Sequence, residues 1–375
     1  MPSQGEGVST ATAGSVGPQP PGASGGPIFV IGAMGSGSTL LRLMLDSHEH
    51  IAMPQETGFL RLALSHTWVP FWEHGGEWHR RLGLTDDELV AELRGFFGGL
   101  FERYARERGK QRWGEKTPFH VWYTELARRI FPDAVFVGTV RHPGAVAVSL
   151  HERFDDWPWP RAVGHWVRET TALVQIGCDL GGRFTLLRYE DLVRNPEPTM
   201  RELLDWLGEP WSAQVLSHHE VQPRSGGPVE VEGMTRIDDP LDPRRSTRWT
   251  ANVNDEVRAL LRTRAAALAG FLGYDVDDAE QLGELTAVPG RHLINGADLA
   301  RRRAEDRTLD WSTRPAPAWQ DQQLRRPPTA WSSGAPAPEK PAPLSRRFTR
   351  RLPAPLRIRW YRLRRDHPWI DPRRR

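Results

Sequence analysis

The chain has 375 residues, of which 38% are hydrophobic and 26% charged, and it contains one cysteine, Cys178. A single cysteine excludes a disulfide framework and a cysteine-based metal cluster, and its apolar neighbours favour a buried structural thiol. No segment reaches the ~20 consecutive apolar residues of a membrane span, and the N-terminus lacks a secretory signal pattern. We therefore expect a cytoplasmic protein.

The positive charge of the chain is concentrated at its end. Residues 346–375 contain twelve arginines and two aspartates, a net charge of +10, whereas the whole chain carries +3, so residues 1–345 carry −7. An acidic body does not favour nucleic-acid binding, and no nucleic-acid partner is expected. The tail interleaves arginine with Trp, Tyr and Leu, which predicts contact with anionic membranes; a merely solvated end is the alternative.

The first predicted elements follow a segment of low complexity. Residues 1–26 are rich in Gly, Ser, Ala and Pro and are expected to be disordered. "PIFVIG", from Pro27, predicts a buried strand, and "TLLRLMLDSH" predicts a buried helix after a Gly/Ser loop. Thr85 and Glu88 form a capping-box pattern that opens an amphipathic helix over residues 85–110.

The middle of the chain alternates strand and helix patterns. "DAVFVGTV", residues 133–140, is typical of a central parallel strand, and Pro143 suits the first turn of the next helix. "RFTLLRYEDL" predicts another strand, and helices are predicted over residues 195–208 and 254–274. This alternation predicts an α/β fold with a P-loop-like parallel sheet flanked by helices.

The chain is expected to divide into four parts. The patterns fade after the last helix, so residues 276–345 are predicted to form an extension with a Pro-rich linker. The four parts are a disordered segment over 1–26, a catalytic domain over 27–275, the extension over 276–345 and the basic tail over 346–375.

The loop "GAMGSGST", residues 32–39, carries the first functional signal. A strand, a Gly/Ser loop and a helix N-terminus together form an anion cradle. The spacing is that of a P-loop, but Ser38 stands where the nucleotide-binding motif has lysine. No predicted strand ends in a carboxylate that could hold Mg²⁺, which disfavours triphosphate cleavage. A tight glycine turn without a ligand is the alternative.

Four motifs in chain order resemble the sulfotransferases that use 3′-phosphoadenosine 5′-phosphosulfate (PAPS). "GAMGSGSTLLRLMLDSHEHIAMPQET" is similar to the family's 5′-phosphosulfate loop and the segment that follows it, and "RHPGAVAVS" is similar to its 3′-phosphate motif. "WGEKTP" and "RYEDLV" occur at the family's relative positions. The resemblance implies in-line transfer of a sulfuryl group from PAPS to an acceptor hydroxyl or amine, with a glutamate base and no metal.

The resemblance also implies roles for particular residues. Glu56 matches a general base, and Lys116 matches a cation at the leaving oxygen. A helix-start glutamate and a solvated lysine are the structural alternatives. The residues implied for donor binding are Gly35, Ser36, Gly37, Ser38 and Thr39 in the loop, Arg141 and Ser149 at the 3′-phosphate, Tyr189 at the adenosine, and Ser246 and Arg248 in a closing segment.

Two departures from the family pattern indicate which branch of the family the chain resembles. Many relatives place Arg or Lys at Gly35, which gives Lys116 more of the catalytic task. The cytosolic branch has tryptophan at Leu40, so this chain is closer to the tyrosylprotein and carbohydrate branches, as a bacterial-like member. The acceptor is left open among a carbohydrate, a glycolipid, a peptide and a natural product.

Aromatic and histidine side chains give weaker signals. Trp157, Trp159 and Trp166 are predicted either to line an acceptor site or to pack under a loop. His142 favours a structural role over that of a base, and no metal is assigned to His48 and His50. A P-loop kinase and a protein that binds membranes or nucleic acid through its tail are the competing functions.

Overall fold

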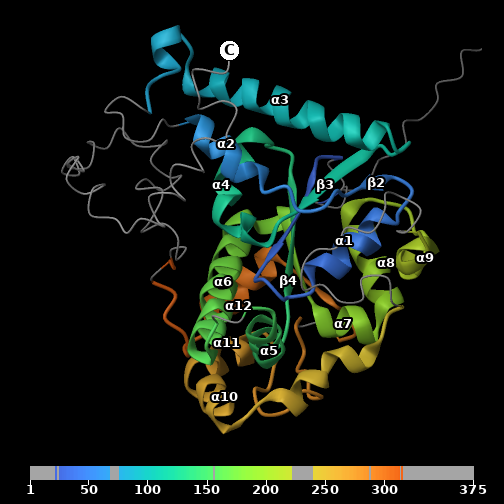
Figure 1. Ribbon diagram of the computed structural model, residues 1–375, viewed down its shortest axis with the longest axis vertical. Coiled ribbons are helices and arrows are strands. Elements are labelled where there is room, and N and C mark those ends of the chain that lie inside the picture. The colour runs from blue at the N-terminus through green and yellow to red at the C-terminus, as the bar shows by residue number, and fades with distance from the viewer. Residues whose placement is uncertain are drawn as a thin grey trace, which may run out of the picture. The chain divides into compact units, whose positions relative to one another are not determined.

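The computed structural model describes residue 22 and residues 25–67, 76–154, 157–221, 240–286, 289–312 and 314–315. Within them, six strands form one sheet in the order β2-β3-β1-β4-β5-β6, parallel throughout except for β6, which is antiparallel to β5 (Figure 1). The strands are β1 Ile28–Gly32, β2 Ile51–Ala52, β3 Arg112–Lys116, β4 Val135–Val140, β5 Phe184–Arg188 and β6 Leu293–Asn295. The predicted α/β fold with a mainly parallel sheet is confirmed.

Helices cover both faces of this sheet. Figure 1 shows α1 and α8 on one side of β4 and α6 and α12 on the other, with α3 running past β2 and β3. The helices are α1 Ser38–Asp46, α2 Phe59–Thr67, α3 Asp86–Arg106, α4 Thr124–Ile130, α5 Pro143–Arg153, α6 Trp159–Leu180, α7 Tyr189–Arg194, α8 Pro196–Leu207, α9 His218–Val221, α10 Asp255–Leu260, α11 Ala266–Phe271 and α12 Gly296–Glu305.

Strand β1 is buried on both faces, which explains its unbroken apolar sequence. Ile28 and Val30 point into a core that includes side chains of α1 and α8. Phe29 points the other way, where its ring lies 5.4 Å from that of Phe136 and 6.0 Å from that of Trp113, measured between centroids. Because side chains alternate along a strand, one five-residue strand anchors two cores.

The predicted capping box is confirmed at α3. The Thr85 side chain accepts from the Glu88 backbone N–H, and Glu88 returns the bond to Thr85. The helix predicted over residues 254–274 is present but interrupted by a π-helical turn, Leu261–Ala265, between α10 and α11. Asn254 caps its start by accepting from the Val257 N–H.

The sheet continues past the predicted end of the catalytic domain. Strand β6 and helix α12 lie within the extension predicted over 276–345, and Asn295 caps α12 by accepting from the Asp298 N–H. A strand of three residues is too short to show a period in the sequence. The predicted boundary at residue 275 therefore falls between elements that pair in one sheet.

Several predicted segments lie outside the described residues. They comprise nearly all of residues 1–26, most of the Pro-rich linker and the whole basic tail. Over the parts of the chain that are described, no helix is both long and apolar enough to cross a bilayer.

Candidate active site

The site lies at the carboxyl edge of the sheet, where ligands of open α/β folds bind. Strand β1 is flanked by β3 and β4, so the loop after β1 sits between the ends of both neighbours. Lys116 pairs in register with Val30, and Gly32 pairs with Thr139, two residues before Arg141. The strand order thus brings the loop, Lys116 and Arg141 together.

The loop adopts a backbone that glycine favours. Gly35 and Gly37 have φ of 82° and 91°, in the left-handed region. A Cβ on Gly37 would lie 2.2 Å from Tyr189 Cδ2, so the tyrosine ring packs directly on the loop. Ser36 Oγ lies 2.8 Å from Thr139 Oγ1, which ties the loop to β4.

Helix α1 begins at Ser38, directly after the loop. Its N-cap residue is Gly37, which has no side chain that could cap the helix. The N–H groups of a first helical turn lack partners within the helix, and the helix dipole adds partial positive charge there. The loop and the start of α1, including Thr39, therefore suit an anionic group, as the sequence predicts.

Lys116 and Glu56 meet beside this loop. The Lys116 ammonium donates to Thr39 Oγ1 at 3.0 Å and also to Glu56 Oε1. The lysine side chain is 1% exposed, whereas that of Glu56 is 42% exposed. Burial lowers the pKa of Lys116, and the neighbouring Glu56 carboxylate opposes that shift. A solvated loop lysine, the structural alternative, is excluded because Lys116 is buried in β3.

Arg141 lies on the other side of the loop. Its guanidinium donates to the Gly35 carbonyl at 3.3 Å and to the Arg245 carbonyl at 3.1 Å, and lies 4.3 Å from the centre of the Tyr189 ring. Its Nε is buried and has no hydrogen-bond partner among the described residues. A Cβ on Gly35 would lie 3.6 Å from Ser149 Oγ, so Ser149 adjoins the same place.

The predicted closing segment contacts Arg141, but through Arg245, which was not among the predicted site residues. The 3-10 turn η6, Pro243–Ser246, packs against α7, and the carbonyl of Arg245 meets Arg141. Ser246 is buried, and its hydroxyl donates to the Pro243 carbonyl at 2.7 Å. Arg248 donates to Asp242 at 2.6 Å. The donor-binding roles of Ser246 and Arg248 stay predictions, and the signal for Arg245 was its place in the basic run "RRSTR".

The three tryptophans have different surroundings. Trp166 is fully buried, and its indole N–H donates to the Arg141 carbonyl at 2.9 Å, so of the two predicted alternatives it takes the packing role. Trp159 stacks on His151 with centroids 3.8 Å apart, and Trp157 packs edge-on against His165. Both rings are partly exposed and stay candidates for an acceptor site.

His142 is held as a structural group. Its Nδ1 accepts from the Gly144 N–H at 3.1 Å, so Nε2 carries the proton and donates to the Asp275 carbonyl at 2.9 Å. Its ring stacks on that of Trp249, 4.3 Å away. Burial lowers the pKa of His142 to about 4. With both ring nitrogens engaged, His142 supports the start of α5.

His48, His50 and Glu209 come together, although the sequence assigned them no metal. One ligand atom from each lies within 4.8 Å of the others. However, His48 Nδ1 accepts from the His50 backbone N–H and its Nε2 bonds to the Pro210 carbonyl, while Glu209 also pairs with Arg112. These bonds use the atoms that a cation would need, so we assign no site there.

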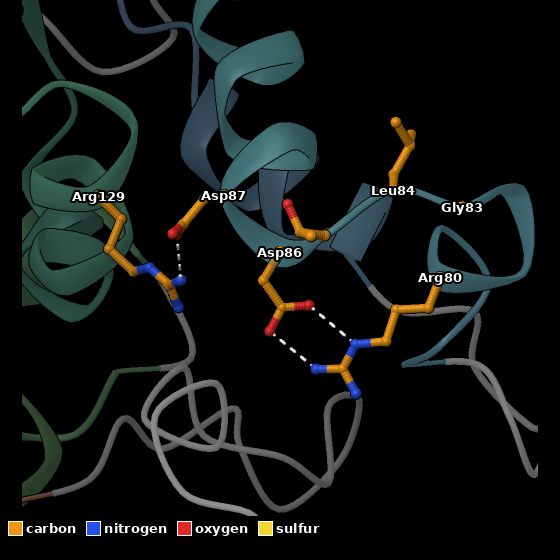
Figure 2. Close-up of a pocket in the computed structure, with 7 residues that line it drawn as sticks. Arg80, Gly83, Leu84, Asp86, Asp87 and Arg129 are labelled. Atoms are coloured by element: carbon orange, nitrogen blue, oxygen red, sulfur yellow. Dashed lines mark hydrogen bonds and ion pairs between the residues drawn. The ribbon is translucent and has the colours of Figure 1, made fainter.

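A separate surface hollow lies at the start of α3. Figure 2 shows its charged side chains paired with one another, Arg80 with Asp86 and Arg129 with Asp87. The nitrogen–oxygen distances are 2.9 Å and 3.6 Å. Gly83, Leu84 and Thr85 complete its lining. Because the opposite charges neutralise each other, this hollow does not compete with the sheet edge as a candidate site.

A family model described as the sulfotransferase family matches residues 27–213. The chain belongs to the sulfotransferase family. Among curated relatives, protein-tyrosine sulfotransferase 1 of Danio rerio is 28% identical over 261 residues, which cover 66% of this chain and 72% of the relative. Protein-tyrosine sulfotransferase 1 of Homo sapiens is 29% identical over 262 residues, covering 66% and 69%.

A solved sulfotransferase domain from the curacin biosynthetic pathway has the same fold. It aligns with a TM-score of 0.50 at 21% identity, over 67% of this chain and 98% of that domain. Because it belongs to the sulfotransferase family, the chain is an enzyme that transfers a sulfuryl group, and the kinase interpretation is set aside. Membership of this family implies in general that PAPS donates the sulfuryl group.

Proposed function

We propose that this sulfotransferase takes the sulfuryl group from PAPS and transfers it to an acceptor hydroxyl, with Glu56 as the general base. The observation that carries the proposal is the Thr39–Lys116–Glu56 contact at the start of α1. It joins an anion cradle, a buried cation and a half-exposed carboxylate in one place. A donor anion, its leaving oxygen and a reacting hydroxyl require these three groups.

The residues at the sheet edge fit the anionic groups of such a donor. The loop over residues 32–39 and the start of α1 suit the 5′-phosphosulfate. Arg141 and the adjacent Ser149 suit the 3′-phosphate, since the buried Nε of Arg141 still has a bond to make. The Tyr189 ring, packed on the loop and on Arg141, suits the adenosine. When bound, PAPS supplies an activated sulfuryl group with adenosine 3′,5′-bisphosphate as the leaving group.

Two side chains then divide the chemistry. Glu56 accepts the proton of the acceptor hydroxyl as its oxygen attacks, and its exposed fraction leaves the carboxylate within reach of an acceptor. Lys116 keeps its proton and holds positive charge at the leaving oxygen. Because Lys116 is buried, its charge is poorly screened by water and acts strongly at short range.

We propose a tyrosine hydroxyl of a peptide or protein as the acceptor. The support is that the curated relatives from Danio rerio and Homo sapiens are named protein-tyrosine sulfotransferases. The test is incubation with PAPS and a tyrosine peptide, or with its phenylalanine twin, followed by mass spectrometry. Sulfation of the tyrosine peptide alone supports this acceptor; activity toward a simple sugar but not toward the peptide contradicts it.

The donor is tested separately, by thermal shift. Adenosine 3′,5′-bisphosphate should stabilise the protein without added metal, by about 2.7 kcal/mol at 100 times its Kd. Mg²⁺-ATP serves as the control, since it lacks a 3′-phosphate for Arg141 and Ser149. Stabilisation by Mg²⁺-ATP alone would contradict PAPS as the donor.

The base is tested with Glu56→Gln. The amide is isosteric but cannot take a proton, so turnover should fall by about 10²–10⁴-fold while donor affinity is kept. Glu49→Gln, an exposed carboxylate on a nearby segment, is the matched control. Acidic phenol acceptors should partly rescue Glu56→Gln, because they need less help in losing the proton. Near-normal turnover of Glu56→Gln with a tyrosine peptide, whose phenol carries no activating group, removes Glu56 from the mechanism.

A further inference from the structure

The loop that carries Glu56 is fastened to β3 on the side away from Lys116. The Thr57 backbone N–H donates to Glu115 Oε1 at 3.1 Å, and the Thr57 hydroxyl donates to the same oxygen at 2.9 Å. The Gly58 N–H donates to Thr117 Oγ1 at 3.2 Å. The residues directly after Glu56 thus bind the residues directly before and after Lys116.

Glu115 is the centre of these contacts. Its carboxylate is fully buried, and Oε1 accepts a third bond, from the Thr117 hydroxyl, at 2.6 Å. Its Oε2 lies 2.8 Å from Nδ1 of His120. Burial by itself raises the pKa of Glu115, but the charge of His120 and the hydrogen bonds from His120, Thr117 and Thr57 outweigh it, and the pKa is lowered. The carboxylate is therefore ionised, with three hydrogen bonds accepted at Oε1 and the His120 ring beside Oε2.

Side chains alternate at the end of β3, so neighbouring residues of this strand contact the Glu56 loop from opposite sides. Lys116 points toward Thr39 and Glu56, whereas Glu115 and Thr117, one residue away on either side, point toward Thr57 and Gly58. The loop therefore wraps the strand end. A shift of Thr57 along the strand would move Glu56 relative to the Lys116 ammonium.

We propose that Thr57 and Glu115 are positioning residues. They hold the Glu56 carboxylate beside Lys116, where it can take the proton of the acceptor hydroxyl. This inference rests on the proposed role of Glu56 as the base. Thr57 is itself an exposed loop residue, so without the two bonds to Glu115 its segment has little buried surface to fix it. Proton transfer needs a heavy-atom distance of about 2.6–3.2 Å, and a misplacement of about 1 Å can cost about 10²-fold in rate.

The test compares Thr57→Val with Thr57→Ser. Valine removes the hydroxyl that donates to Glu115 but keeps the backbone N–H and the shape, whereas serine keeps the hydroxyl. We expect Thr57→Val to lower kcat by about tenfold with little change in the KM for PAPS, and Thr57→Ser to restore kcat. Thr117→Val, which removes the other hydroxyl bonded to Glu115, should act in the same direction.

The decisive measurement repeats Thr57→Val in the Glu56→Gln background. If Thr57 acts only by placing the Glu56 carboxylate, the valine should leave kcat unchanged there, a strongly non-additive cycle. An equal fall in both backgrounds, or a fall that appears in the KM for PAPS, overturns the positioning role. Normal turnover of Glu56→Gln alone would instead overturn the proposed base, so the two failures are distinguishable.

Discussion

Substituting Glu56 and substituting Lys116 should lower the free energy of unfolding by different amounts, because the two side chains differ in burial. Glu56→Gln leaves an ammonium that is 1% exposed without its counter-charge, with Thr39 as its other bonded side chain. Lys116→Met replaces that ammonium with an apolar chain of similar length and leaves a carboxylate that is 42% exposed. Water can solvate the unpaired Glu56 carboxylate but not the unpaired Lys116 ammonium.

The magnitude follows from that difference in exposure. Removing one partner of a fully buried ion pair costs about 3–5 kcal/mol of unfolding free energy. Since Glu56 is nearly half exposed, its attraction is partly screened, and we expect Glu56→Gln to cost about 1–2 kcal/mol. Lys116→Met should cost less than ~1 kcal/mol, although it removes the more buried residue, because no charge is left stranded in the interior.

The pH dependence has a definite sign. The folded-state pKa of Lys116 already lies below its ordinary value of 10.5, and loss of Glu56 should lower it further. Between the folded and unfolded pKa values the unfolded chain binds more protons, so stability rises with pH in this window. The stability deficit of Glu56→Gln should therefore be larger at neutral pH than near pH 10.5, where the lysine of the unfolded chain also loses its proton.

The assay is urea unfolding of the wild type and both variants from pH 7 upward. Glu49→Gln, an exposed carboxylate on a nearby segment, is again the control and should be neutral. A larger loss for Lys116→Met than for Glu56→Gln at pH 7 would refute the reasoning. So would a Glu56→Gln deficit that grows as the pH rises.

Three further outcomes are expected. Arg141→Ala should weaken binding of adenosine 3′,5′-bisphosphate more than Ser149→Ala does, since charged hydrogen bonds are worth about twice neutral ones; equal losses by calorimetry would contradict this. Gly37→Ala should abolish donor binding, because its Cβ would clash with the Tyr189 ring at a φ of 91°, and an unchanged Kd would argue against the loop as the cradle. Deleting residues 346–375 should reduce binding to anionic vesicles at low salt without affecting the donor, and a full-length chain that ignores such vesicles would exclude membrane contact by the tail.

Much of the fold could be predicted because the determining interactions are local. The capping box at Thr85 and the unbroken apolar runs of β1 and β4 reflect a helix start and two-sided burial, both visible in a short window. Strand β6 and helix α12 were missed for the opposite reason. Three residues of strand show no period, and β6 is defined by its pairing with β5, more than a hundred residues earlier.

The sequence by itself determined that a glycine-rich loop joins a buried strand to a helix, since Gly35 and Gly37 are needed for that backbone. It also determined which side chains could bind anions and move protons. Only the tertiary structure decided their partnerships. Lys116 meets Glu56 across sixty residues, and Arg141 meets the Arg245 carbonyl across more than a hundred. The strand order β3-β1-β4 places Lys116 and Arg141 on either side of the loop after β1, and the segments that carry Glu56 and Arg245 fold back onto them. Neither arrangement leaves a local pattern in the sequence.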